Sequence, residues 1–124
     1  MKAGKIWGKT EALFSRNNVE IHRIEIEKGG YCSKHKHEHK WNMFYVESGE
    51  LEVIVWKGGD GHDSTLLIAG DNSAVPPGEL HQFRAMTDVI AYEVYWTELN
   101  ANDIVRETVG GRIIPEAPKV VAAA

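Results

Sequence analysis

Two runs of glycine, proline and histidine at fixed spacings constrain the fold of this chain more than any other feature. In the first run, five residues separate Gly29 from His35, and His37 follows after one more residue. Four residues then lead to Asn42, and six more lead to Gly49. Side chains two positions apart on a strand point to the same face, so the two histidines can bind one ion together. This run therefore predicts a chelating pair on a strand.

The second run starts at Gly70 and reaches Pro76 after five residues, with Gly78 and then His81 close behind. Proline fixes φ and a nearby glycine can take positive φ, so we expect a rigid turn before His81. Borderline divalent metals bind neutral imidazole well, and three imidazoles leave positions open for water or substrate. We therefore predict that His81 joins the histidine pair of the first run as a third metal ligand.

Hydrophobic alternation with period two dominates the chain from residue 19 to residue 96 and indicates strands rather than helices. Many short strands with turns every 8 to 12 residues are typical of an antiparallel sandwich or barrel, so the predicted fold class is all-β. The one helix candidate covers residues 102–107. The expected strands cover residues 19–27, 31–37, 41–47, 51–56, 64–69, 80–85 and 89–97.

The length of 124 residues predicts one domain. We expect a barrel core at about residues 19–97, an N-terminal arm at 1–18, and a C-terminal segment and tail at 98–124. An exposed sheet edge in a small barrel favours pairing with a second copy, which predicts a homodimer. Trp7 and Phe14 of the arm could supply that contact, or the arm could pack on its own barrel.

Charge and cysteine content limit the partners and the location. The net charge of −4 gives no basic field for nucleic acid, so we expect no nucleic-acid partner. The sequence shows no apolar run of about 18 residues and no signal-peptide core, which predicts no membrane association. Cys32 is the only cysteine, which excludes an internal disulfide and fits a reducing compartment. We predict a cytoplasmic protein.

Together the two runs resemble the two signature motifs of the cupin superfamily, over residues 21–96. Every glycine, proline and histidine of both motifs falls in place, whereas Asn42 stands where the family usually has a metal-binding glutamate and Ala85 where it usually has an asparagine. The resemblance implies a small antiparallel double-stranded β-helix, or jelly-roll, barrel. It also implies one divalent transition metal, which could be Zn, Fe, Mn, Ni or Co.

Asn42 decides the charge of the predicted site. Its side-chain oxygen is a neutral and weaker ligand than a carboxylate, so the metal would keep its full charge. Direct coordination, a hydrogen bond to a ligand and no metal role all remain open for this residue. His39 continues the alternation of His35 and His37 and could replace the missing carboxylate, or it could lie in a solvated turn.

Glu93 is an acid inside a strongly apolar final strand. A buried carboxylate is costly unless it is paired, so Glu93 is the candidate catalytic acid or base, unless it faces solvent. Tyr45 and Phe83 are candidates to contact a substrate in the barrel, with filling of the core as the alternative for each.

A shorter resemblance links the chain to the cupin barrel of type II phosphomannose isomerases. Glu93 is followed by valine, then by the sequence Asp-Ile-Val-Arg at 103–106, and later by Gly-Gly-Arg ending at Arg112. The resemblance implies that Arg106 and Arg112 bind sugar or phosphate oxygens, to which guanidinium groups are suited. The chain departs from that family where Asn42 is followed by methionine and phenylalanine instead of histidine and tryptophan.

The predicted function is that of a mononuclear metal-binding cupin with a small carbohydrate-like or oxyacid ligand. If it is an enzyme, an isomerase or epimerase that moves a proton between adjacent carbons is the first expectation. An Fe(II)-dependent oxygenase and a non-catalytic small-molecule-binding cupin are the alternatives.

Overall fold

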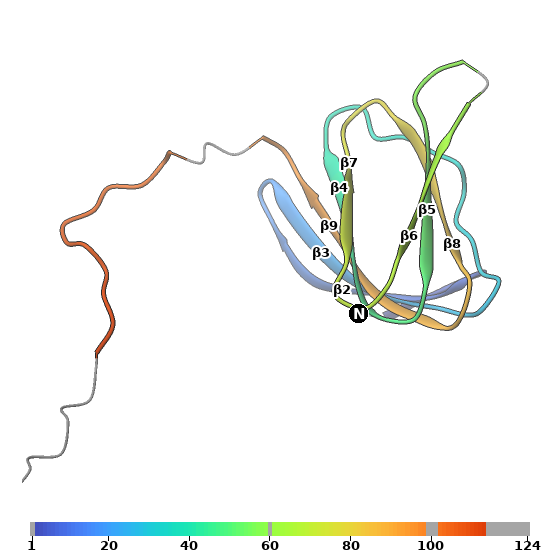
Figure 1. The fold of residues 1–124 in the computed structure, drawn as a ribbon, viewed down its shortest axis with the longest axis horizontal. Coiled ribbons are helices and arrows are strands. Elements are labelled where there is room, and N and C mark those ends of the chain that lie inside the picture. Colours follow the sequence, from blue (N-terminus) through green and yellow to red (C-terminus); the bar gives the residue numbers. More distant parts are fainter. Residues whose placement is uncertain (1, 60, 99–101, 114–124) are drawn as a thin grey trace, which may run out of the picture.

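The computed structural model describes residues 2–59, 61–98 and 102–113, in which nine strands form two antiparallel sheets (Figure 1). A six-stranded sheet has the order β1-β2-β3-β9-β4-β7, and a three-stranded sheet has the order β6-β5-β8. The predicted all-β fold is confirmed. No helix among the described residues is long and apolar enough to span a membrane. The strands are β1 (Lys2–Lys5), β2 (Gly8–Arg16), β3 (Val19–Ile26), β4 (Trp41–Ser48), β5 (Leu51–Trp56), β6 (Asp63–Leu67), β7 (Asn72–Val75), β8 (Leu80–Ala85) and β9 (Val89–Trp96).

The core fills the space between the two sheets, and strand alternation decides which side chains enter it. Every second residue of β4 is buried, and the buried row starts with Asn42 and continues with Phe44 and Val46. In β8 the buried row starts with His81 and continues with Phe83 and Ala85. The two polar residues therefore occupy core positions at one end of the hydrophobic rows.

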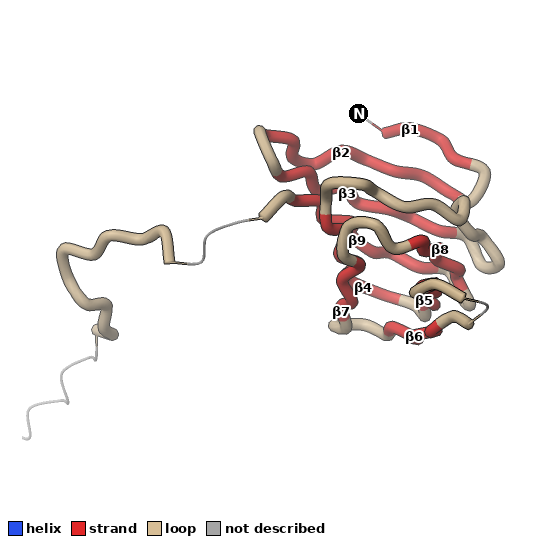
Figure 2. Tube along the Cα trace, turned by 90° about the horizontal axis from the view of Figure 1, so that it is seen from above, coloured by secondary structure: helices blue, strands red, loops and turns tan. Residues whose placement is uncertain are grey.

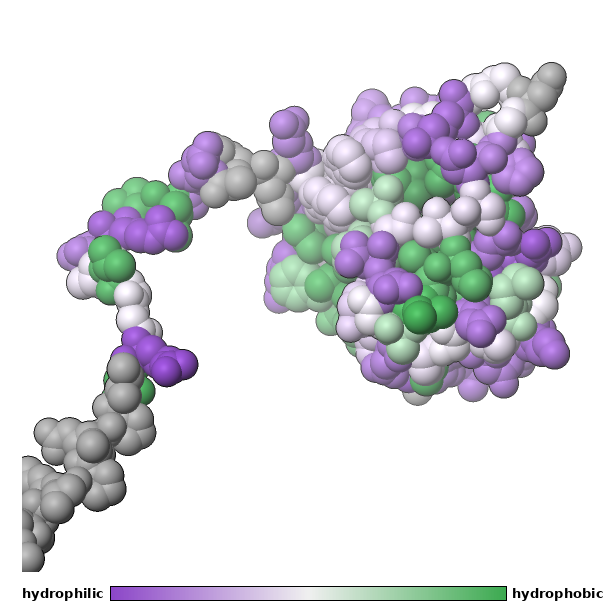
Figure 3. Space-filling view, in the orientation of Figure 1, coloured by the Kyte–Doolittle hydropathy of each residue, from purple (hydrophilic) through white to green (hydrophobic). Residues whose placement is uncertain are grey.

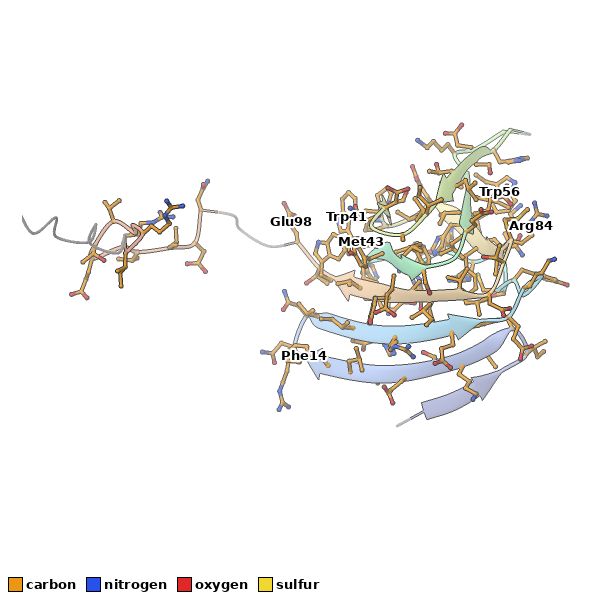
Figure 4. The ribbon with its side chains drawn as sticks, turned by 60° about the horizontal axis from the view of Figure 1, so that its bottom comes forward. Phe14, Trp41, Met43, Trp56, Arg84 and Glu98 are labelled. Atoms are coloured by element: carbon orange, nitrogen blue, oxygen red, sulfur yellow. The ribbon has the colours of Figure 1, made fainter. Side chains whose placement is uncertain are left out.

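Residues of the opposite parity lie on the outer face of the six-stranded sheet. Trp41 stacks on Trp96 with ring centroids 5.9 Å apart and an interplanar angle of 11°. Tyr45 is 40% exposed and contacts the Tyr92 ring at 6.4 Å. Figure 4 labels Trp41 and Met43 near β9 in the six-stranded sheet, and Trp56 and Arg84 in the three-stranded sheet.

The N-terminal arm is not a separate arm but two further strands of the larger sheet (Figure 2). β1 pairs with β2 and β2 pairs with β3, with a register shift between Ala12 and Phe14. This shift breaks the period-two pattern, which is why the alternation predicted no strand there. Trp7 packs edge-on against Phe83 with centroids 5.1 Å apart, so this residue packs on its own barrel.

Two glycines allow the β1–β2 turn to approach the barrel closely. Gly8 has a φ of 154°, and a Cβ there would collide with the backbone of Glu25. A Cβ on Gly30 would lie 2.8 Å from the carbonyl oxygen of Trp7. The amide of Glu27 donates a hydrogen bond of 3.0 Å to that same oxygen. The turn is therefore fixed against the segment that follows β3.

The segment 31–37 was predicted as a strand, but it forms only two isolated bridges, Tyr31 to Arg84 and His35 to His81. The amide of His35 donates to the His81 oxygen at 3.0 Å, and the amide of His81 donates to the His35 oxygen at 2.8 Å. The segment thus runs beside β8 without a continuous ladder. Residues 72–75, which lay outside the expected strands, form β7.

The predicted helix at 102–107 is wrong, because these residues are irregular and exposed. A helix of one or two turns is marginal without tertiary packing, and Ile104 and Val105 are β-branched. Residues 102–113 extend away from the barrel (Figure 1), and Figure 3 shows hydrophobic surface on them as well as on the barrel. The exposed apolar side chains of this segment include Ile104, Val105, Val109 and Ile113.

Candidate metal centre

The three histidines of the two sequence runs meet inside the barrel. The candidate ligand atoms of His35, His37 and His81 all lie within 4.8 Å of one another. His81 belongs to β8, and the bridge between His35 and His81 holds the first run beside it. Their ring centroids are 4.6 Å apart for His35 and His81, and 5.0 Å apart for His35 and His37. Residues 46 positions apart in the sequence thus form one cluster, as predicted.

Backbone carbonyls fix the tautomer of two of these imidazoles. Nδ1 of His35 donates to the carbonyl oxygen of Ser33 at 2.7 Å, and Nδ1 of His81 donates to that of Glu79 at 3.0 Å. A carbonyl oxygen can only accept, so Nδ1 carries the proton and Nε2 keeps its lone pair. Such outer hydrogen bonds orient metal-ligating imidazoles in proteins. Both rings are therefore prepared to bind a cation through Nε2.

Two polar atoms of the cluster are buried without a hydrogen-bond partner among the described residues, Nε2 of His37 and Nδ2 of Asn42. Asn42 is 0% exposed, and its Oδ1 lies 3.2 Å from Nε2 of His81. With the His81 proton on Nδ1, Nε2 of His81 accepts a hydrogen bond from Asn42 when the amide turns its nitrogen toward the ring. A divalent cation would satisfy the imidazole nitrogens, so the residues present fit the metal that the resemblance implies.

Burial also keeps two of the ligands neutral. Desolvation, with smaller contributions from His35, Lys40 and His81, lowers the pKa of His37 to about 4. Desolvation likewise lowers the pKa of His81, although the hydrogen bond to Glu79 opposes this in part. Metals bind the deprotonated imidazole, so protons compete with a metal at His37 only in strongly acidic solution.

A cavity of about 300 Å³ adjoins the histidine cluster at His35. Glu93 of β9 faces this cavity and is only 9% exposed, so the inward alternative is the one that the fold adopts. The hydroxyl of Tyr95 donates a hydrogen bond of 3.0 Å to Oε2 of Glu93. Burial raises the pKa of both groups, and the neighbouring Glu93 carboxylate adds to the rise at Tyr95.

Other polar and aromatic residues line the same cavity. His22 of β3 lies directly opposite Glu93 in the strand register, and its Nε2 is 3.2 Å from Oε2 of Glu20. The His22 ring also contacts that of Tyr95, at 5.7 Å. The remaining lining residues are Lys5, Trp7, Thr10, Cys32, Ser33 and Phe83.

The structure brings some predicted residues to this site and leaves others outside it. Phe83 lines the cavity, whereas Tyr45 points to the outer face of the sheet, and its predicted contact with substrate finds no support in its position. His39 is exposed and is not part of the histidine cluster. Arg106 and Arg112 lie in the exposed segment 102–113, so the structure does not bring them to the cavity.

Sequence reasoning missed most of the cavity wall, including Tyr95, His22, Lys5 and Trp7. Tyr95 and His22 are inward by strand parity, because Tyr95 is two residues from Glu93 and His22 is two residues from Ile24. That signal was available in the alternation. Lys5 and Trp7 had no such signal in the sequence, because they reach the cavity only through the unpredicted β1–β2 turn.

Cys32 is not part of the histidine cluster. Its Sγ accepts a hydrogen bond of 3.2 Å from the amide of Phe83. Burial raises the pKa of the thiol to about 11, so it stays protonated at neutral pH. We assign it a structural role, because metals bind the thiolate.

Two antiparallel sheets around an internal histidine cluster define a class of small all-β barrel proteins with a candidate metal centre. Residues 22–98 match the sequence model of the cupin domain, and the chain belongs to this family. The match starts at His22, so it includes the whole histidine cluster and excludes the β1–β2 hairpin.

Solved structures agree with this assignment. An RmlC-like cupin from Shewanella frigidimarina superposes with a TM-score of 0.67 and 27% identity, over 85% of this chain and 88% of that chain. KdgF from Halomonas sp. gives a TM-score of 0.69 and 16% identity, over 81% and 88% of the two chains. A W96Y oxalate decarboxylase from Bacillus subtilis gives 0.70 and 16%, over 78% of this chain but 27% of that one. No match was found among curated proteins.

Proposed function

We propose that this chain is a mononuclear metal-binding cupin that binds a small carbohydrate-like or oxyacid ligand and acts on it by acid–base chemistry of the isomerase or epimerase type. The observation that carries the proposal is the convergence of three imidazoles, His35, His37 and His81, whose candidate ligand atoms all lie within 4.8 Å of one another. The fully buried Asn42 lies against His81. These residues lie beside a cavity that contains a buried acid.

The four residues would hold one divalent transition metal. None of the four carries a negative charge, so the ion keeps a stronger attraction for an anionic or hydroxyl-rich ligand than it would beside a carboxylate. When bound, such an ion polarises a carbonyl or hydroxyl oxygen of the ligand as a Lewis acid.

Glu93 is the residue that would move the proton. A general acid or base works best when its pKa lies near the working pH, and burial shifts the pKa of Glu93 in that direction. The hydrogen bond from Tyr95 fixes the orientation of the carboxyl group. Phe83 closes the cavity on the apolar side and would exclude water from the reacting atoms.

Proton exchange with solvent tests this function directly. The metal-loaded protein is incubated in D₂O with a panel of aldoses, ketoses and 2-hydroxy acids, and deuterium uptake at carbon is followed by ¹H NMR. We expect uptake for at least one compound, and a loss of about a hundredfold in Glu93→Gln with unchanged metal content. Uptake that is equal in Glu93→Gln contradicts the role of this residue.

The other predicted functions give different results in the same experiment. A reaction that stops when oxygen is removed indicates the Fe(II) oxygenase instead. A compound that binds without deuterium uptake or product indicates a binding module.

A homodimer and a cytoplasmic location remain predictions, which gel filtration with light scattering and cell fractionation would check.

A further inference from the structure

Part of the cavity wall comes from the β1–β2 hairpin, which lies outside the cupin motifs. Lys5, Trp7 and Thr10 of this hairpin line the same cavity as His35 and Glu93. They precede residue 22, where the match to the cupin domain begins. These residues therefore lie outside the two sequence motifs.

The hairpin is built into the barrel rather than laid loosely against it. Its turn is held by the hydrogen bond from Glu27 to the carbonyl of Trp7, and the Trp7 ring packs on Phe83. Gly8 and Gly30 permit this approach because any side chain there would collide with backbone. Lys5 is the last residue of β1 and pairs with Gly8. Its place at the cavity is thus set by backbone contacts.

The charged groups at the cavity favour positive over negative charge. Glu93 is the only carboxylate among the residues that line it, and burial raises the pKa of that group, which disfavours its negative charge. Lys5 supplies a full positive charge, and a metal on the neutral ligand set would add two more. A cavity with this balance attracts anions.

Lys5 and Trp7 lie where the cavity opens to solvent. Both residues also line a second, larger groove of about 650 Å³ that shares Cys32 and Ser33 with the cavity. Lys5 is exposed, whereas the histidine cluster lies deeper, with His81 only 1% exposed. A ligand that bound the metal at one end would therefore place its other end near Lys5.

We propose that the β1–β2 hairpin selects the ligand, and that Lys5 binds a second anionic group of a small oxyacid whose first oxygen group binds the metal. This inference rests on the proposed metal-binding function and names its ligand class as a dianion. The cavity of about 300 Å³ lies at the lower end of the range of ligand sites, which suits a molecule of this size. Trp7 and Thr10 shape the wall beside that group.

A series of dicarboxylates of increasing length tests the inference. Cobalt(II)-loaded protein is titrated with oxalate, malonate, succinate and glutarate, with acetate as the ligand that has one anionic end. Affinity is measured by calorimetry at low ionic strength, and the cobalt absorption spectrum reports binding at the metal. We expect one dicarboxylate to bind more tightly than acetate. Oxalate and malonate can bind the metal through both carboxylates, so only a preference that Lys5→Met removes reports the distance from the metal to Lys5.

Variants assign this preference to Lys5. In Lys5→Met we expect the preference over acetate to fall about fivefold, the upper range for a charge pair that keeps contact with solvent, with acetate affinity and cobalt content unchanged. Lys5→Arg should retain the preference, and added salt should reduce it in the wild type. Lys9→Met is the matched control, because Lys9 lies on the same hairpin but does not line the cavity.

The contrary results distinguish a failure of the hairpin's role from a failure of the metal-binding function. A preference that survives in Lys5→Met, or a wild-type protein that binds no dicarboxylate better than acetate, overturns the role of the hairpin and leaves the metal function standing. A protein that takes up no cobalt, or whose cobalt spectrum responds to none of these anions, overturns the metal function and this inference together.

Discussion

The histidine cluster and the cavity beside it are both polar regions inside an apolar barrel, but their hydrogen bonds are arranged in opposite ways. In the cluster, Nε2 of His37 and Nδ2 of Asn42 have no hydrogen-bond partner among the described residues. In the cavity, Tyr95 donates to Glu93, and His22 lies within hydrogen-bond distance of Glu20. The cluster therefore keeps buried polar atoms without a partner, whereas the acid in the cavity is paired within the chain.

This difference separates two kinds of buried polar group. Unpaired polar atoms in a folded interior cost free energy unless a bound partner satisfies them. Paired groups can instead store or transfer a proton without a bound metal. A bound metal would therefore stabilise the cluster, whereas the pairs in the cavity need none.

The largest effect is expected from removing one imidazole of the cluster. His81→Ala should strip the metal or weaken its binding at least about tenfold, because a site of few neutral ligands loses one of its strongest. Elemental analysis after dialysis measures this. His62→Ala is the control, since His62 is exposed and lies against Trp56, far from the cluster in the sequence and not part of it. Full metal occupancy in both variants would show that the ligands are assigned wrongly.

A smaller effect is expected when Asn42 is given a charge. Asn42→Asp should raise the affinity for zinc or manganese by about tenfold, because a carboxylate is the stronger ligand for such ions. Without metal, the same variant should be less stable by about 2 kcal/mol, since it buries an acid at a fully buried position beside His81, an imidazole whose pKa burial lowers. Chemical denaturation with and without metal measures both quantities.

The control for this variant is Asn72→Asp, on the exposed side of the neighbouring strand β7. It should change neither the metal affinity nor the metal-free stability by a comparable amount. An Asn42→Asp protein with unchanged metal affinity would mean that Asn42 does not touch the ion.

The histidine cluster was predictable from the sequence because its geometry depends on local rules. Strand parity aligns His35 with His37, and the rigid Pro76–Gly78 turn presents His81. These rules do not require a complete strand: residues 31–37 form only two bridges and still bring the imidazoles together. The role of Asn42 stayed open because a single residue type does not reveal whether its amide oxygen faces an acceptor.

The cavity was predictable only in part, because it depends on contacts between distant segments. The apolar surroundings of Glu93 marked it as a candidate, but the choice between inside and outside needed the register of β9 against β3 and β4. Lys5 and Trp7 depend on a hairpin whose β-bulge hides its alternation. Arg106 and Arg112 were proposed from a short resemblance alone, and the fold leaves them on an exposed segment.

The smallest expected effect concerns the cost of burying Glu93. Its pKa in the unfolded chain is near the ordinary value of 4.5, and burial raises it in the folded protein. Between the two values the folded protein binds more protons than the unfolded chain, so its free energy of unfolding falls as the pH rises from about 4.5.

Glu93→Gln removes this dependence and leaves an amide that can still accept the Tyr95 hydrogen bond. The free energy of unfolding of Glu93→Gln minus that of the wild type should therefore increase with pH above about 4.5 and then level off. The total increase is about 1.4 kcal/mol for each unit by which burial raises the Glu93 pKa. Urea unfolding of both metal-free proteins measures it. Glu98→Gln, at an exposed position after β9, should show no such trend. A Glu93→Gln difference that stays constant with pH would mean that the carboxyl group is hydrated in the folded protein, and the cavity would then lack the shifted acid that sets it apart from the histidine cluster.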